Sequence, residues 1–206
     1  MTTAEGITAR KRPTGRRSGD SGTRDAILDA AKELFAELGY DGASIRAIAT
    51  RAGVDPALIR HFFGDKETLF AHTVADRTAI PARMSAAFSD GDPAQRGIRV
   101  TDTYLRLWED AETRPILHAL IRSATTSERA AAMLREVLMA RVLEGVAPGP
   151  FADGQLQLIS LAASHLLGVA MARFVVRFPA IADRPHDDLV AEIAPTIQRY
   201  LSGTHR

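Results

Sequence analysis

Apolar residues recur at helical spacing along most of the chain. From Thr23 onward one face carries Ile27, Leu28, Ala31, Leu34, Phe35 and Leu38, and the opposite face carries Lys32, Glu33 and Glu37. Spacings of three and four residues are typical of an amphipathic α-helix. No segment alternates apolar and polar residues with a period of two, and no internal repeat of fixed length is present. The pattern therefore predicts an all-α chain of about nine helices.

Turn and capping residues divide the first third of the chain into four helices. Candidate N-caps for these helices are Thr23, Ser44, Asp55 and Asp65. Gly39 is a candidate C′ residue for the first helix, and the second and third helices end at Ala52 and Phe63. Pro56 suits the first position of the third helix. The fourth helix either continues past Pro81 or kinks there.

Turn-rich segments bound the helices of the remaining chain. These segments are 89–93, 110–115, 125–127 and 145–154, and the final helix runs from about His186 to Leu201. The stretch Leu156 to Phe178 is long and apolar enough to cross a membrane, but Arg173 would be costly well inside a bilayer. We therefore expect no membrane span. The small residues Ser160, Ser164, Gly168 and Ala172 form a ridge that admits another helix, from the same chain or from a second subunit.

Composition and charge narrow the class of protein. The chain has no cysteine, which excludes disulfide scaffolds, Cys-based zinc sites and thiol nucleophiles and makes the cytoplasm the default compartment. The formal net charge is +1, but positive charge is concentrated before residue 25. Residues 1–22 also have few large apolar side chains, so we expect a disordered basic arm that either contacts phosphates or is a solvated tail. It lacks the apolar run of a signal peptide.

The segment 45–64 carries the most specific pattern, that of a helix-turn-helix. This motif needs a small residue where two helices cross, a turn residue with positive φ, and apolar residues that fix the crossing angle. Ala49 and Gly53 meet the first two requirements. The residues that meet the third are Ile48, Ala52, Val54, Ile59 and Phe62. An ordinary αα-corner is the alternative interpretation.

Four stretches extend this pattern beyond the motif. They are Leu34-Phe35-Ala36-Glu37-Leu38-Gly39-Tyr40, Ser44-Ile45-Arg46-Ala47-Ile48-Ala49, Gly53-Val54-Asp55-Pro56-Ala57-Leu58-Ile59 and Phe63-Gly64-Asp65-Lys66-Glu67. Together they resemble the N-terminal DNA-binding domain of the TetR/AcrR family of transcriptional regulators, in detail from Arg24 to Phe70. The resemblance implies a DNA-binding domain over residues 23–70. It implies a helical ligand-binding and dimerisation domain over residues 71–206.

The third helix is expected to enter the major groove of DNA, where an α-helix fits and base edges are distinguishable. With its apolar side turned inward, its outward residues are Pro56, Ala57, Leu58, Arg60 and His61. Ala57 and Leu58 suit thymine methyl groups, and His61 suits a base or a phosphate. Arg60 stands where members of the family commonly have a tyrosine, so its partner is either a phosphate or a guanine.

Residues outside the third helix complete the candidate DNA interface. The resemblance implies a DNA contact from Arg46 and a phosphate contact from Lys66, and Ser44 is a further phosphate candidate. For Arg51, a solvated charge on the helix face is at least as consistent with the sequence as a contact with DNA. The segment 24–70 holds six basic and eight acidic residues, with four of the acids on the first helix. Because neutralised phosphates supply much of non-specific affinity, this balance increases the importance of the basic arm.

The fourth to eighth helices are expected to enclose an effector pocket. Candidate lining residues are Met84, Phe88, Tyr104, Trp108, His118, Met133, Met139, His165 and Met171, each of which also suits an ordinary core. Their Met and aromatic content favours an apolar or aromatic small molecule. His118 and His165 are candidate polar anchors.

The last two helices are the candidate homodimer interface. Beside the ridge of small residues, the final helix offers Leu189, Val190, Ile193, Ile197 and Leu201, and Pro195 is expected to kink it. His186-Asp187-Asp188 is interpreted as the start of that helix, where acids favour the positive end of the dipole.

These observations predict a cytoplasmic, homodimeric repressor that binds a palindromic double-stranded DNA operator and is released by a small molecule. The ligand is expected to press on the far end of the fourth helix near Met84 or Phe88 and change the spacing of the two recognition helices. The alternative is a DNA-bound structural or interaction protein with the same fold and no ligand. No zinc-protease motif, phosphate-binding glycine loop or nucleophile elbow is present, so we expect no catalysis, cofactor or metal.

Overall fold

The computed structural model describes residues 18–126, 128, 131–132, 135 and 153–203, and no strand occurs among them. Its α-helices are α1 (Ser18–Gly42), α2 (Ile45–Ala52), α3 (Pro56–Phe63), α4 (Lys66–Arg77), α5 (Ile80–Ser89), α6 (Arg96–Glu109), α7 (Arg114–Thr126), α9 (Asp153–Ala170), α10 (Pro179–Ala182) and α11 (His186–Ser202). A 3-10 turn, η1 (Pro93–Gln95), precedes α6, and a π-helical turn, η2 (Met171–Val175), follows α9. The all-α prediction is confirmed.

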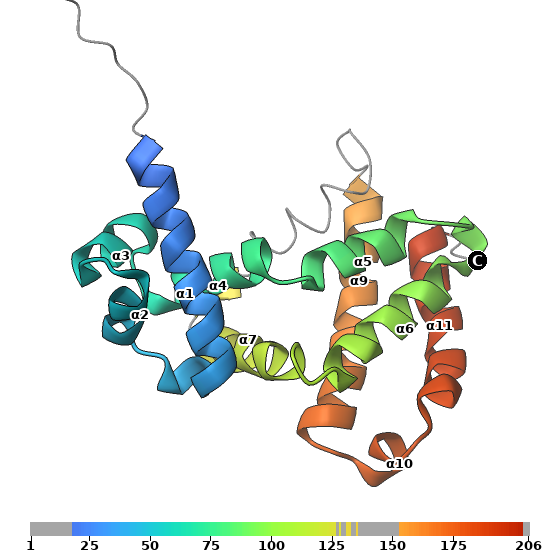
Figure 1. The fold of residues 1–206 in the computed structure, drawn as a ribbon. Helices are drawn as coiled ribbons and strands as arrows, with labels where there is room; N and C mark the ends of the chain where they lie inside the picture. Colours follow the sequence, from blue (N-terminus) through green and yellow to red (C-terminus); the bar gives the residue numbers. More distant parts are fainter. Residues whose placement is uncertain (1–17, 127, 129–130, 133–134, 136–152, 204–206) are drawn as a thin grey trace, which may run out of the picture.

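The described helices form two lobes (Figure 1). We call α1, α2 and α3 the head, and α5, α6, α7, α9, α10 and α11 the body. α4 leads from the head to the body, and α7 lies below it in this view. Both α4 and α7 contact α1. Two helices therefore connect the lobe that carries the helix-turn-helix with the rest of the chain.

The first helix differs from the sequence prediction at its start. It begins at Ser18, so residues 18–22 of the predicted disordered arm are helical, whereas residues 1–17 lie outside the described residues. Its main run breaks at Gly39, where φ is 70°. This positive φ agrees with the prediction that Gly39 ends the helix, because glycine has no Cβ to oppose it.

The head has a core of large apolar side chains from α1, α2 and α3. Ile27, Leu28, Ile48, Ile59 and Phe63 are all buried. The sequence placed Phe62 inward, but Phe62 is only partly buried. Ile59 and Phe63 are four residues apart and share one face of α3, which turns Phe62 toward the edge of the core. The correction leaves the predicted outward face of α3 largely unchanged.

The fourth helix neither continues past Pro81 nor kinks there. α4 ends at Arg77, and Pro81 lies in the first turn of the separate helix α5. The Thr78 hydroxyl donates a hydrogen bond to the Val74 carbonyl at 2.6 Å as α4 ends. Proline is tolerated in the first turn because it lacks only an N–H that has no helical partner there. Met84 and Phe88 therefore belong to α5 rather than to the far end of α4.

The body is built around the crossing of α6 and α11. At Gly97 a Cβ atom would lie 2.6 Å from the Ala194 carbonyl oxygen, so only glycine fits the crossing. The Gly97 N–H donates to Gln198 Oε1 at 2.6 Å. The same crossing buries Leu189, Val190 and Ile197 of α11 within the chain. These three side chains are core rather than interface, which corrects part of the dimer prediction, whereas Ile193 and Leu201 are only partly buried against the same core.

Much of α9 faces solvent in the single chain. Leu156, Leu161 and Leu167 are 43 to 45% exposed. Beside them Ser160, Ser164 and Gly168 are exposed, and a Cβ at Gly168 would meet nothing within 4 Å. Leu156–Val175 is the one described stretch that is long and apolar enough to cross a membrane, and 17% of its most apolar window is buried. α11 runs through Pro195 as one element, and the kink expected there stays a prediction.

Candidate DNA interface and ligand pocket

The turn between α2 and α3 has the geometry that a helix-turn-helix requires. Ser44 Oγ accepts a hydrogen bond from the Ala47 N–H at 3.1 Å and so caps α2. Gly53 has φ 67°, and Ala49 is buried where the helices meet. Asp55 Oδ1 accepts from the Ala57 N–H at 2.7 Å and caps α3. The predicted caps and turn residue of the motif are confirmed.

The outward face of α3 carries most of the residues predicted to contact DNA. Ala57, Arg60 and His61 are exposed, and Leu58 is 39% exposed. Pro56 is half-buried, so it has less surface to offer than predicted. Leu58 therefore has apolar surface accessible from outside the head.

The acidic residues of α1 are paired with cations elsewhere in the chain. Arg51 forms ion pairs with Glu33 at 2.9 Å and Glu37 at 3.1 Å, and Arg77 pairs with Asp25 at 2.5 Å and Asp29 at 2.7 Å. The hydrogen bond from Arg51 lowers the pKa of the Glu37 carboxyl. Four carboxylates that made segment 24–70 acidic are thereby offset within the fold, and Arg51 is committed to α1.

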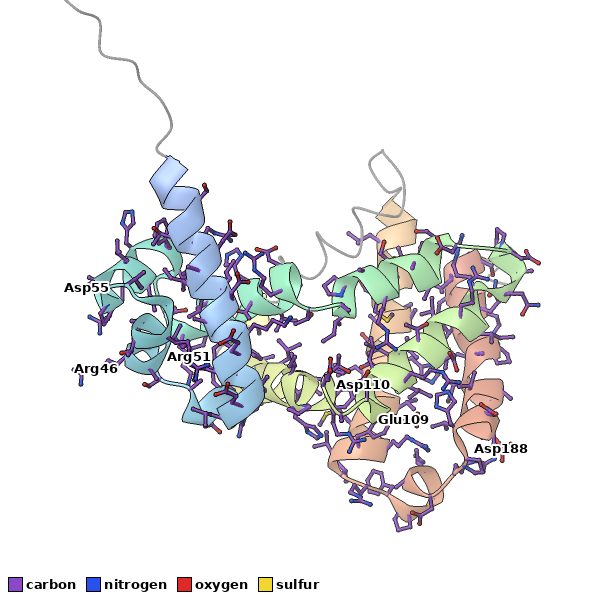
Figure 2. All side chains as sticks on the ribbon, in the orientation of Figure 1. Arg46, Arg51, Asp55, Glu109, Asp110 and Asp188 are labelled. Atoms are coloured by element: carbon purple, nitrogen blue, oxygen red, sulfur yellow. The ribbon has the colours of Figure 1, made fainter. Side chains whose placement is uncertain are left out.

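Arg46 and Arg60 differ from Arg51 in this respect. Both are exposed, and within the described part of the chain neither side chain has an ion-pair partner. Figure 2 shows Arg46 at the outer edge of the head and Arg51 beside α1. The cations on the outer side of the motif are therefore available for phosphates or bases.

Lys66, at the start of α4, lies against an aromatic ring. Its Nζ is 4.4 Å from the centroid of the Tyr40 ring, and burial lowers the pKa of the ammonium group. Tyr40 in turn packs on Phe70 with ring centroids 5.0 Å apart. This cation–π contact ties the start of α4 to the end of α1. The phosphate contact implied for Lys66 stays a prediction.

The body contains a cavity of about 360 Å³. Its lining residues are Ile80, Pro81, Met84, Phe88, Val100, Tyr104, Leu107, Trp108, Leu117, Leu120, Ile121, Ala124, Ile159, Ala162, Ala163, Leu166, Leu167 and Leu201. This volume is at the lower end of the range of pockets that take drug-sized ligands, roughly 300 to 1,000 Å³. None of these residues carries a charge at neutral pH.

Four of the predicted lining residues meet at this cavity: Met84, Phe88, Tyr104 and Trp108. Three do not line it. The His118 ring packs edge-on against Trp108 at 5.3 Å, the His165 ring packs against Tyr200 at 6.3 Å, and Met171 belongs to η2. Burial lowers the pKa of His118, which favours its neutral form. Met133 and Met139 lie outside the described residues.

Sequence reasoning chose His118 on α7 and His165 on α9, and missed the apolar residues of these two helices that line the cavity. On α7 these are Leu117, Leu120, Ile121 and Ala124, and on α9 they include Ile159 and Leu166. Their spacing of three and four residues is visible in the sequence, but it marks an apolar face without showing whether that face meets a core or a cavity.

The fold and both sites define a helix-turn-helix regulator with a separate apolar pocket, and comparisons with known proteins agree. The model of bacterial regulatory proteins of the tetR family matches residues 27–73, and the model of the tetracyclin repressor-like C-terminal domain matches residues 94–201. The second match alone covers more than half of the chain. The chain belongs to the TetR family, whose members are DNA-binding transcriptional regulators.

Individual relatives differ in how much of the chain they cover. The crystal structure of a TetR-family regulator from Streptomyces coelicolor is 33% identical over 91% of this chain and 99% of its own, with a TM-score of 0.58. The transcriptional regulator BetI of Burkholderia thailandensis is 29% identical over 47% of this chain, and the match spans 58% of BetI. The repressor AcnR of Corynebacterium glutamicum is 46% identical over 32% of this chain and 37% of AcnR. The strongest identity is therefore confined to a short segment.

Proposed function

We propose that this protein is a cytoplasmic homodimeric repressor that binds a palindromic DNA operator and leaves it when an apolar small molecule enters the cavity of the body. The observation that carries this proposal is the combination, in one chain, of two outward arginines on the helix-turn-helix that have no ion-pair partner among the described residues, and a cavity of about 360 Å³ whose described lining residues carry no charge. The cavity favours ligand control over the alternative of a DNA-bound structural protein.

The DNA contacts follow from the outward residues of the head. Arg46 and Arg60 supply charge, Ala57 and Leu58 supply apolar contacts, and the Ser44 hydroxyl keeps a proton to donate after accepting its capping bond. Backbone contacts position the head, and contacts from α3 to base edges specify the sequence. One helix of eight residues reads few base pairs, which favours a dimer on two half-sites.

The dimer interface is proposed on the outer face of α9. This face combines exposed leucines with small residues at Ser160, Ser164 and Gly168, and such a surface suits the close approach of a second helix. Burial against a partner also accounts for the apolar character of α9 without a membrane. α11 takes part only through its outward side, because its apolar side is already packed on α6.

Ligand binding is proposed to act on the head through α7. The cavity is bordered by α5 and α7 but by no residue of α4, and α4 ends before α5 begins. Ile121 of α7 lines the cavity, and its neighbour Arg122 forms an ion pair with Asp41 of the head at 2.5 Å. A ligand that shifts α7 would therefore move a contact on the head directly.

The test begins with selection of bound sequences from random DNA by the full-length protein. Fluorescence anisotropy of the selected duplex then gives affinity, stoichiometry and salt dependence. We expect two protomers on a roughly palindromic site and a steep loss of affinity with salt. Binding of equal strength to unrelated DNA at all salt concentrations would contradict the proposal.

A further inference from the structure

The wall of the cavity offers a ligand few polar atoms. Among the side chains of its described lining residues, nitrogen and oxygen atoms occur only in the Tyr104 hydroxyl and the Trp108 indole. Both residues lie on α6, four positions apart, with ring centroids 6.4 Å apart. A carboxylate or ammonium group in this cavity would lose its hydration without gaining an opposite charge. The wall therefore selects against charged ligands.

The two polar groups act as hydrogen-bond donors. Trp108 Nε1 is buried and has no hydrogen-bond partner within the described part of the chain. Burial raises the pKa of the Tyr104 phenol to about 12, with a smaller opposing effect from the Trp108 indole, so the phenol keeps its proton at neutral pH. A buried N–H without an acceptor is unfavourable, and a ligand oxygen that accepts from the Tyr104 hydroxyl would make the phenolic oxygen a better acceptor for the indole N–H.

We propose that the effector is an uncharged, mainly hydrocarbon molecule with a hydrogen-bond-accepting oxygen, such as a ketone or an ester, held by Tyr104 and Trp108. This inference rests on the proposed function, because it names the chemical class of the effector. The oxygen accepts from the Tyr104 hydroxyl, and the phenolic oxygen is then polarised to accept from the indole N–H. The hydrocarbon part contacts the leucine and isoleucine side chains of α7 and α9.

Three probes with the same carbon count separate these requirements. Hexanophenone has a neutral carbonyl, hexylbenzene has no oxygen, and 6-phenylhexanoate carries a charge at pH 8. Each is titrated into the full-length protein without DNA, with excitation of Trp108, the one tryptophan in the chain. We expect hexanophenone to bind about fivefold to tenfold more tightly than hexylbenzene, from one neutral hydrogen bond. The carboxylate should bind most weakly and gain affinity as the pH approaches its own pKa.

Two conservative variants locate the hydrogen bond. Tyr104→Phe keeps the ring and removes the hydroxyl, so hexanophenone should lose its advantage while hexylbenzene keeps its affinity. Tyr200→Phe is the matched control, because Tyr200 packs against His165 and does not line the cavity. This control should keep the preference for the ketone.

Several outcomes would overturn the inference: no binding of any probe, 6-phenylhexanoate binding as tightly as hexanophenone at pH 8, or an unchanged ketone preference in Tyr104→Phe. Release of operator DNA is measured separately by anisotropy. Ketone binding without release would refute the proposed release mechanism and leave the ligand class standing. Release of operator DNA by ligands that show no preference for a neutral oxygen would refute the proposed ligand class and leave the release mechanism standing.

Discussion

Arg122 of α7 and Asp41 of α1 form an ion pair, with Nη1 and Oδ2 2.5 Å apart, that joins the body to the head. Their side chains are 52% and 69% exposed, so the pair contributes little to stability, about 0 to 1 kcal/mol. Its position is more informative. The preceding residue, Ile121, lines the cavity, so the ligand pocket and the head meet at adjacent residues of one helix.

Removing this ion pair should uncouple the two sites. We expect Arg122→Ala to keep its stability within about 1 kcal/mol and to bind operator and ligand separately with nearly normal affinity. The effect of ligand on operator affinity should shrink severalfold, as measured by anisotropy. Arg106→Ala is the control, because Arg106 forms an exposed pair with Asp102 on the same helix, α6. If ligand lowered the operator affinity of Arg122→Ala as much as that of the wild type, the ion pair between Arg122 and Asp41 would not transmit the effect of ligand from α7 to the head.

Two arginines of α2 should differ in their effect on DNA binding. Arg46→Ala should weaken binding and reduce the slope of log K against log salt by roughly one unit if the side chain contacts a phosphate. Arg51→Ala should change neither, because Arg51 is paired with Glu33 and Glu37. Equal losses of DNA affinity in Arg46→Ala and Arg51→Ala would contradict the expected difference between the two arginines. Arg60→Ala, measured alongside, should relax base preference if Arg60 contacts guanine.

Local chemistry explains which features of the head could be predicted from sequence. The caps at Ser44 and Asp55 and the turn at Gly53 depend on the residue and its immediate neighbours, and each was predicted correctly. The start of α1 was not, because Ser18 to Gly22 contains two glycines and two serines, which have low helix propensity. Local composition does not show that the helix formed by the following residues also includes this first segment.

The body shows the limit of periodicity. The apolar face of α11 was recognised from Leu189, Val190 and Ile197, but a periodic face does not name its partner. The deciding residue was Gly97 on α6, which lets α11 approach too closely for a Cβ and so commits that face to the core. In the same way, the helical spacing of Leu120 and Leu166 suits a core equally well, and only the packing shows that both line a cavity.

Gly97 should be among the least substitutable residues in the chain. A Cβ there would meet backbone and Gln198 atoms at 2.6 to 2.7 Å, so Gly97→Ala should lower the free energy of unfolding by about 1 to 3 kcal/mol. Gly22→Ala is the control, because that helical glycine has open space around it. It should instead stabilise slightly, by roughly 0.5 to 1 kcal/mol, through helix propensity. Denaturant titration followed by circular dichroism checks both, and equal stability of Gly97→Ala and wild type would contradict the close crossing.

The proposed dimer face can be tested at Gly168. The site is open in the single chain, so Gly168→Leu should fold normally but prevent close approach of a second α9. Sedimentation velocity should therefore show folded monomers. Gly22→Leu, at a similarly open position on α1, should stay dimeric. A Gly168→Leu protein that remains a dimer with native stability would remove this face from the interface.

The most direct test of a ligand-released repressor is the affinity for hexanophenone, measured by Trp108 fluorescence with and without saturating operator DNA. Coupling between two sites is reciprocal, so a ligand that lowers operator affinity must bind less tightly when operator is present. We expect the ligand Kd to rise about 5- to 150-fold on the selected operator, which corresponds to a coupling of about 1 to 3 kcal/mol, and to be unchanged by DNA that is not bound. An identical ligand Kd with and without operator would contradict ligand-controlled release.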